Sequence, residues 1–136
     1  MGVTADLVRR YIELYNDGTP ETYGSDAFLQ IYAADVDWAE APTLMTPQGR
    51  SGNREALRAA VESGQQLFRN RRQVIDEMIE DGDRAIWLGV WSASVAAEGF
   101  LAPIGARLEL PVAMLIVARD GLIVRQRDYP TTPFVR

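Results

Sequence analysis

Three side chains in this 136-residue sequence have a type and a setting suited to proton transfer. Glu40 follows Trp38 by two residues in a predicted strand, so both side chains share a face. A carboxyl group next to an indole loses solvent, which raises its pKa toward the range useful for acid–base catalysis. Asp128 lies near the end of another predicted strand, and Tyr11 falls on the apolar stripe of a predicted helix. These residues predict a site that moves protons with carboxyl and phenol groups.

Each of the three residues also has a purely structural interpretation. Glu40 would then be a solvated carboxylate at the rim of the fold, and Tyr11 a core tyrosine bonded to a backbone carbonyl. Asp128 would be an ion-pair partner of Arg125 or Arg127. Strand alternation places both arginines on the face opposite Asp128, which argues against that pairing.

The composition excludes several other kinds of chemistry. The sequence contains no histidine and no cysteine, and its 14 cationic residues are all arginine. Ser-His-Asp catalysis, thiolate catalysis, disulfides and Schiff-base chemistry therefore have no residues to act through. The net charge of −5 disfavours nucleic-acid binding. No phosphate loop, metal-ligand spacing or dinucleotide fingerprint is present, so we expect neither metal nor cofactor.

Aromatic side chains indicate an apolar binding cavity. Trp87 and Trp91 are four residues apart in a predicted strand, so they share a face with Gly89. This face either belongs to the core or lines a cavity in which Gly89 leaves space between two flat walls. We expect substrate contacts from eight residues: Phe28, Tyr32, Trp38, Phe68, Trp87, Trp91, Ala113 and Met114.

Helical periodicity dominates the first half of the chain. Apolar residues recur at helical spacing over 4–17, where Thr4 is the expected N-cap, and over 26–34 and 53–68. The spacing predicts three amphipathic helices.

The second half of the chain is typical of strands, and one short strand is expected earlier, over 36–40. The later strands are expected over 72–80, 85–91, 107–118 and 122–129. Since 85–91 is apolar on both faces, we expect both to be covered.

An arginine run, Arg69, Arg71 and Arg72, is interpreted as a solvated entry to the strand over 72–80. The element order α-α-β-α-β-β-β-β predicts one α+β domain, with a curved, mixed or antiparallel sheet wrapped around N-terminal helices.

Scattered residues resemble the nuclear-transport-factor-2-like superfamily, whose fold is a cone. The resemblance covers roughly residues 4–129 and is closest to ketosteroid isomerases and SnoaL-like polyketide cyclases. Its segments are Arg10-Tyr11 with Asn16-x-Gly18, Tyr32-Ala33-x-Asp35, Glu40 before Pro42, Arg50-Ser51-Gly52, and Pro111.

The resemblance to ketosteroid isomerases implies roles for three positions. Those enzymes combine a carboxylate base with an oxyanion hole made of a tyrosine and a protonated aspartic acid, a case known in detail. The base corresponds to Glu40 and the tyrosine to Tyr11. The second acid should lie two residues after Pro111, where this sequence has Ala113. The resemblance therefore implies an oxyanion hole with one donor missing.

The ending Gln126-Arg127-Asp128-Tyr129 is similar to that of SnoaL-like and limonene-epoxide-hydrolase-like proteins, in which an aspartate on the last strand acts as acid or base. Asp128 corresponds to that residue. The hydrolases add an arginine and an aspartate where this sequence has Gly89 and Trp91. Epoxide opening therefore remains only a further alternative.

These features favour a cofactor-independent isomerase or cyclase acting on a small, apolar, oxygenated molecule such as a polyketide. The alternative is a module of the same fold that binds or dimerises without catalysis, using an outer sheet face around Ile123. A homodimer in the cytoplasm, without nucleic-acid or membrane partners, is the expected setting.

Overall fold

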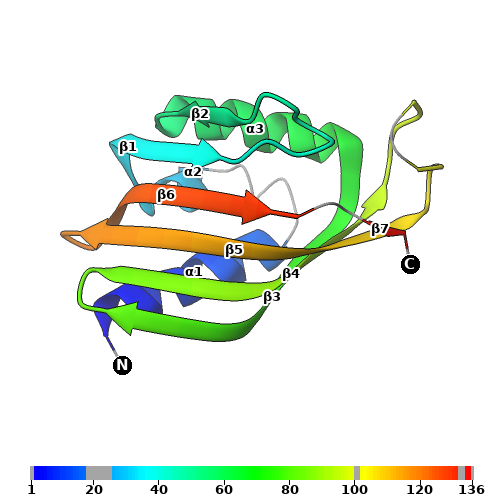
Figure 1. Ribbon diagram of the computed structural model, residues 1–136. Helices are drawn as coiled ribbons and strands as arrows, with labels where there is room; N and C mark the ends of the chain where they lie inside the picture. Colours follow the sequence, from blue (N-terminus) through cyan, green and yellow to red (C-terminus); the bar gives the residue numbers. More distant parts are fainter. Residues whose placement is uncertain (1, 18–25, 100–101, 132–133, 136) are drawn as a thin grey trace.

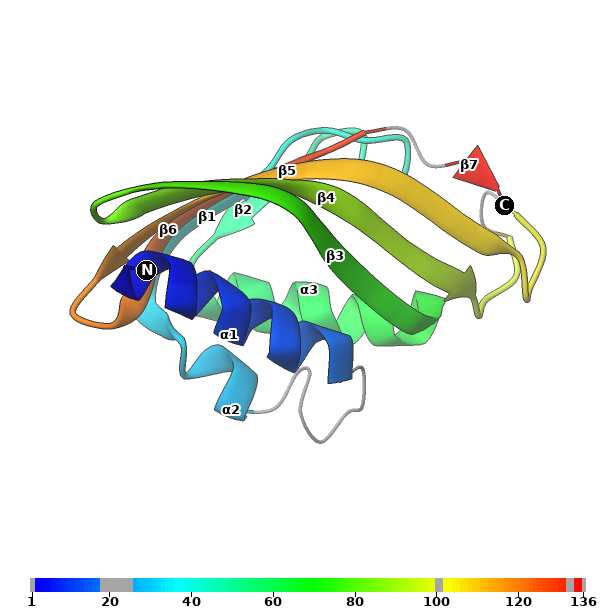
Figure 2. The same cartoon turned by 90° about the horizontal axis from the view of Figure 1, so that it is seen from below.

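A single curved sheet lies over the helices (Figures 1 and 2). The computed structural model describes residues 2–17, 26–99, 102–131 and 134–135. The described helices are α1 (Val3–Asp17), α2 (Asp26–Leu29) and α3 (Arg54–Leu67). The strands are β1 (Tyr32–Glu40), β2 (Arg50–Gly52), β3 (Phe68–Asp81), β4 (Arg84–Val95), β5 (Arg107–Arg119), β6 (Leu122–Pro130) and β7 (Phe134–Val135). The predicted α+β class is confirmed.

The strand order across the sheet is β2-β1-β6-β5-β4-β3, and β7 pairs with β5 outside this path. β1 and β6 run parallel, whereas the other neighbours run antiparallel, so the sheet is mixed. The order brings β1 beside β6, although residues 41–121 separate them in the sequence. All three helices lie on one side of the sheet, and the other side carries none of the described helices (Figure 2).

Several predicted boundaries were wrong. The expected second helix over 26–34 is a four-residue turn, because β1 already begins at Tyr32 and pairs with β6. Two short strands, β2 and β7, were not predicted. β2 has three residues and β7 has two, which are too few to show the alternation of apolar and polar residues that marks a strand.

The N-terminus of α1 is capped by β3 and not by Thr4. The carboxylate of Glu80 accepts from the backbone N–H groups of Gly2 and Ala5, at 3.0 and 2.7 Å. Thr4 lies inside the helix and donates its hydroxyl to the carbonyl of Gly82. In α3 the Asn53 side chain caps the first turn by accepting from the N–H groups of Glu55 and Ala56, a cap that was not predicted.

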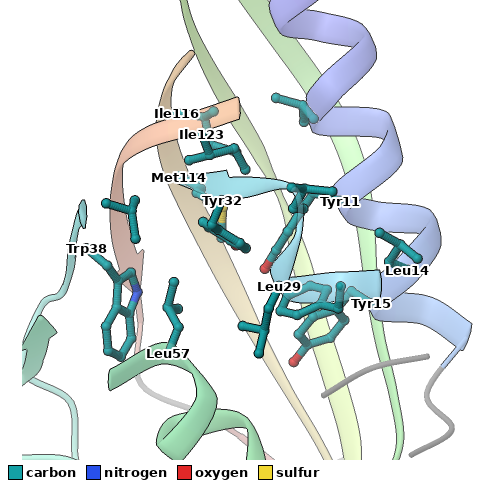
Figure 3. Packing of buried hydrophobic residues seen from close by; sticks show 14 of the residues in the cluster. Tyr11, Leu14, Tyr15, Leu29, Tyr32, Trp38, Leu57, Met114, Ile116 and Ile123 are labelled. Atoms are coloured by element: carbon teal, nitrogen blue, oxygen red, sulfur yellow. The ribbon is translucent and has the colours of Figure 1, made fainter. Parts of the chain in front are cut away.

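The core fills the space between the helices and the inner face of the sheet (Figure 3). Trp87 at its centre is fully buried, and Ile123 also points inward, contrary to the expected outer face around it. The outer face of β4 is not covered in the single chain, where Ile86 and Leu88 are 48% and 45% exposed. We expected both faces of 85–91 to be covered, but its apolar outer positions are not covered within the single chain. None of the described helices is long and apolar enough to cross a membrane.

Candidate active site

A cavity of about 280 Å³ lies between the sheet and the helices. This volume is close to the lower limit of roughly 300–1,000 Å³ that is typical of small-molecule sites. Asp128, Glu40 and Tyr11 all contribute to its walls. Six of the expected substrate contacts also line it: Phe28, Tyr32, Trp38, Phe68, Trp91 and Met114.

Trp87 and Ala113 do not line the cavity. Trp87 shares the inward face with Trp91, as expected, but its ring is enclosed by the core. Ala113 pairs with Leu88 and Tyr129, which belong to the outer face of the sheet. Val112 and Met114 take the inward positions on β5, so the place expected for an oxyanion acid presents only apolar side chains to the cavity.

Asp128 on β6 forms the polar centre of one wall. Its residue keeps partial exposure, but the carboxyl group is buried. The indole Nε1–H of Trp38 donates to Oδ2 at 2.9 Å, and Nε2 of Gln126 donates to Oδ1 at 3.0 Å. The parallel pairing of β1 with β6 places Trp38 opposite Gln126 and Glu40 opposite Asp128. Neither Arg125 nor Arg127 contacts the carboxylate, and Arg127 instead pairs with Asp37.

A buried hydrogen-bond chain extends from Asp128 toward the helices. The amide Oε1 of Gln126 accepts from the Tyr32 hydroxyl at 2.8 Å, while its Nε2 serves Asp128. The oxygen and the nitrogen of this buried side-chain amide therefore each have a hydrogen-bond partner, and the two partners fix its orientation. The chain Tyr32–Gln126–Asp128–Trp38 holds the carboxyl group in one position.

Burial raises the pKa of Asp128 to about 7, mainly because desolvation disfavours the charged form. The hydrogen bond from Trp38 opposes this by stabilising the carboxylate, whereas the charge of Glu40 adds to the increase. Gln126 and Arg50 also act to lower the pKa, by a hydrogen bond and by charge. A carboxyl group with a pKa near neutrality can both accept and return a proton.

Glu40 lies beside Trp38, as expected, but it is engaged in an ion pair. Arg50 donates Nε to Oε1 at 3.0 Å and Nη2 to Oε2 at 2.9 Å, so both carboxylate oxygens are occupied. The Thr46 hydroxyl is also within 3.3 Å of Oε1. The Arg50 guanidinium lies 5.7 Å from the centroid of the Trp38 ring, a cation–π distance. This geometry makes Glu40 part of the support for Trp38 and Asp128.

Tyr11 lines the cavity from α1, whereas Asp128 lines it from β6. Its oxygen accepts a hydrogen bond of 2.9 Å from Nε2 of Gln73 on β3. Figure 3 shows Tyr11 and Trp38 on different sides of the buried cluster, with Tyr32, Leu29 and Leu57 also inside it. The structure therefore places Tyr11 in the same cavity as Asp128 but on another wall.

Sequence reasoning missed seven polar residues that line the cavity, namely Thr43, Thr46, Arg50, Ser63, Arg71, Gln73 and Gln126. Arg71 was expected in solvent but is 6% exposed. Alternation contained the signal for it, since Arg71 and Gln73 share a face of β3 whereas Arg72 does not. Among the described residues, no cluster of three or more acidic side chains could hold a metal ion, and the sequence has no histidine or cysteine to add.

Solved structures of similar shape cover nearly the whole chain. A candidate polyketide cyclase from Xanthomonas campestris is 24% identical with a TM-score of 0.74, and the match covers 93% of this chain and 89% of that one. A candidate polyketide cyclase from Streptomyces antibioticus, IdmH, is 20% identical with a TM-score of 0.75, over 93% and 91% of the two chains. These likenesses show a shared fold.

A third similar structure is a protein of ketosteroid isomerase-like fold from Catenulispora acidiphila, solved with trimethylamine. It is 18% identical with a TM-score of 0.71, over 93% of this chain and 85% of that one. No curated protein sequence matches the chain. The SnoaL-like domain matches residues 8–126, which is most of the sequence. The chain therefore belongs to the SnoaL-like domain family, and its fold is the nuclear-transport-factor-2-like cone.

Proposed function

We propose that this protein is a cofactor-independent acid–base enzyme of the isomerase or cyclase type. Its substrate is a small, apolar molecule that carries a carbonyl group. The proposal rests on one observation, which is that the carboxyl group of Asp128 is buried in the wall of an aromatic cavity. This carboxyl group has a pKa near neutrality and is held by hydrogen bonds from Trp38 and Gln126.

Asp128 is the proposed catalytic residue. As a carboxylate it takes a proton from the carbon next to the substrate carbonyl, and the electrons of that C–H bond move into an enolate. The protonated Asp128 then returns the proton to a different carbon in an isomerisation. In a cyclisation the enolate carbon instead attacks a second carbonyl, and Asp128 returns its proton to the resulting alkoxide. Trp38 and Gln126 each bond to a different carboxylate oxygen, which leaves further acceptor positions for the proton.

The other two sequence-predicted residues receive different roles. Glu40 and Arg50 form a supporting ion pair, because both oxygens of Glu40 are already bonded. Tyr11 is the proposed donor to the substrate oxygen, where negative charge develops. No acidic side chain of β5 joins it among the described lining residues, so the site differs from a two-donor oxyanion hole.

Deuterium exchange in a simple ketone tests the proposal. The probe is 1-tetralone, a bicyclic ketone whose α-protons exchange with D2O when a base removes them, as followed by proton NMR. We expect the wild-type protein to accelerate exchange and Asp128→Asn to reduce the rate by about 10²- to 10⁴-fold. Asp37→Asn is the matched control, because Asp37 is exposed and pairs with Arg127 on the other face. Equal exchange rates for wild type and Asp128→Asn would contradict the proposal.

The alternative function, binding without catalysis, gives a different result in the same experiment. A binding module would bind 1-tetralone saturably, as seen in ligand-detected NMR, but would leave its exchange rate at the value for buffer.

We also propose that two copies associate through the outer face of the sheet. Five large apolar side chains are 45–65% exposed there: Val74, Ile79, Ile86, Leu88 and Tyr129. Strand pairing makes them neighbours, since Ile79 faces Ile86, and Ala113 lies between Leu88 and Tyr129. The acidic Glu77 faces Leu88 across β3 and β4, so the exposed apolar side chains form a cluster with a charged residue among them. Large apolar clusters that remain exposed often mark a surface for association. Light scattering should give the mass of a dimer for wild type and of a monomer for Leu88→Arg. Ile104→Arg, in an exposed loop, should remain a dimer, and a monomeric wild type would contradict the proposal.

A further inference from the structure

Gln73 on β3 makes the polar contact to Tyr11 that the proposed proton transfer at Asp128 does not use. Its amide Nε2 donates to the Tyr11 oxygen at 2.9 Å. Both side chains line the cavity, and each residue is only 4% exposed. They come from α1 and β3, whereas Asp128 and Trp38 come from β6 and β1 nearer the opposite edge of the sheet.

The backbone of Gln73 is held by a second residue of α1. The Asn16 side chain accepts from the N–H of Gln73 at 2.7 Å and donates to its carbonyl at 2.8 Å. In the strand order, β3 has a neighbour on one side only, so the Asn16 amide takes the place of a missing strand. Two hydrogen bonds to the backbone and one from the side chain therefore fix Gln73 relative to α1 and to Tyr11.

The other end of the Gln73 amide indicates why an amide stands here. Its Oε1 is buried and accepts no hydrogen bond from any residue in the described part of the chain. An unpaired buried acceptor is destabilising, and an apolar side chain of similar length, such as methionine, would avoid that cost. The amide N–H is a donor that methionine lacks, and its partner among the described residues is the Tyr11 oxygen.

A donor on the phenol oxygen has a defined chemical effect. When the oxygen of Tyr11 accepts from Gln73, its own O–H points away from that amide and acts as a donor. Hydrogen bonds in series polarise one another, so the accepted bond strengthens the donated one. Reversing the first bond would turn the proton of Tyr11 toward residue 73 instead.

We propose that Gln73 is a positioning residue that makes Tyr11 a hydrogen-bond donor to a ketone or enolate oxygen of the ligand. The ligand class, a carbonyl compound, rests on the proposed function. What the Gln73–Tyr11 contact adds is the direction of the hydrogen bond, from the Gln73 amide to the Tyr11 oxygen. This direction places the carbonyl oxygen of the ligand at the end of the cavity near α1 and β3. A reactive carbon bound in the same cavity then faces Asp128.

The infrared carbonyl stretch of bound 1-tetralone, labelled with ¹³C at the carbonyl, tests the proposal. Measurements in an Asp128→Asn background remove any contribution from a protonated Asp128. We expect the stretch to be lowered by a hydrogen bond in this background, and the lowering to be lost in Tyr11→Phe and reduced in Gln73→Met. Loss of this bond should also weaken ketone binding by roughly two- to tenfold.

Gln73→Glu provides a reversal of the hydrogen bond within one variant, again with Asp128→Asn. A neutral Glu side chain donates to Tyr11 as the amide does, whereas an ionised one accepts the proton of Tyr11. The lowered stretch should therefore disappear as the pH rises in this variant, and not in the background protein. This readout does not depend on whether Gln73→Met folds normally.

Two results would overturn the proposal. A carbonyl stretch unchanged by Gln73→Met, with no pH dependence in Gln73→Glu, would show that Gln73 does not direct Tyr11. A lowered stretch that vanishes with Asp128→Asn alone, or a ketone that does not bind at all, would show that the oxygen is not held at Tyr11. Deuterium exchange is measured separately, so proton transfer by Asp128 can fail while the infrared result stands, and the reverse.

Discussion

Asp128 experiences opposing influences that are carried by individual atoms. Desolvation favours the neutral acid, and the negative charge of Glu40 acts in the same direction. The N–H of Trp38 favours the carboxylate, as do the Gln126 amide and the charge of Arg50. The pKa near 7 is therefore a balance, and single substitutions should shift it in either direction.

Two substitutions at the neighbours of Asp128 test this balance. Trp38→Phe removes the indole donor and should raise the pKa of Asp128 further. Glu40→Gln removes a nearby negative charge and leaves the charge of Arg50 uncompensated, so it should lower that pKa. Carbon-detected NMR of the Asp128 carboxyl measures both, and Asp6→Asn, on the exposed side of α1, is the control. Shifts of the same sign in the two variants would contradict this explanation.

Alternation along the strands predicted which side chains share a face better than it predicted their hydrogen-bond and ion-pair partners. Asp128 was separated from Arg125 and Arg127 by alternation along β6, and the structure has that arrangement. The pairing of Glu40 with Arg50 was not predicted, because it depends on the antiparallel register of β1 with β2. A three-residue strand leaves too little pattern to establish such a register.

At the level of elements, Gly89 determines how closely β3 and β4 can approach. Of the two alternatives that the sequence left open, one was that it opens space between two tryptophans in a cavity. Instead, a Cβ at this position would overlap the carbonyl oxygen of Val74 and lie 2.9 Å from the Trp87 ring. The backbone of β3 comes this close beside a register shift between Ile75 and Glu77. Gly89 is thus needed for the irregular pairing of two long strands.

Gly89→Ala should therefore destabilise the protein, because β3 or the Trp87 ring must move to admit one methyl group. The expected loss in the free energy of unfolding is roughly 1–3 kcal/mol, the usual cost of overpacking. Urea denaturation followed by tryptophan fluorescence measures it. Ala59→Ser on the surface of α3 serves as a control with one added heavy atom, and an unchanged midpoint for Gly89→Ala would contradict the close approach.

Helix and strand positions were predicted to different accuracy for physical reasons. The long helices α1 and α3 and the strands β3 to β6 were found from periodicity, since each presents several turns or alternations. The region of α2 and the first residues of β1, 32–34, was mistaken for one helix, whereas the rest of β1 was predicted as a strand over 36–40. There, Phe28 and Tyr32 are both buried and four residues apart, so helical spacing was imitated by a turn followed by a strand.

For the whole molecule, the raised pKa of Asp128 links folding to pH. The folded protein binds a proton at Asp128 that the unfolded chain releases near pH 4. The stabilising effect of this proton is complete below about pH 4 and is lost as the pH rises through about 7. The wild type should thus lose stability relative to Asp128→Asn between these values, by at most about 1.4 kcal/mol per pH unit. Urea midpoints across this range measure the difference, and parallel curves for the two proteins would contradict the linkage.

The overall architecture was accessible from the sequence because its order of elements is informative. Early helices and a later run of strands joined by tight turns indicate an α+β fold. The apolar outer positions of β4 were misassigned, since apolar residues on both faces of a strand do not reveal what covers the second face. In the single chain Leu88 remains 45% exposed there, and a second copy is the proposed cover.

The most direct test of the proposed acid–base site is the pH titration of the Asp128 carboxyl by carbon-detected NMR, assigned by comparison with Asp128→Asn. A pKa of about 7 is expected, because the carboxyl is desolvated at the wall of the cavity. A pKa near the ordinary value for aspartic acid, about 4, would mean that the group is solvated. In that case Asp128 could not serve as an acid and base near neutral pH, and binding without catalysis would become the better explanation of the cavity.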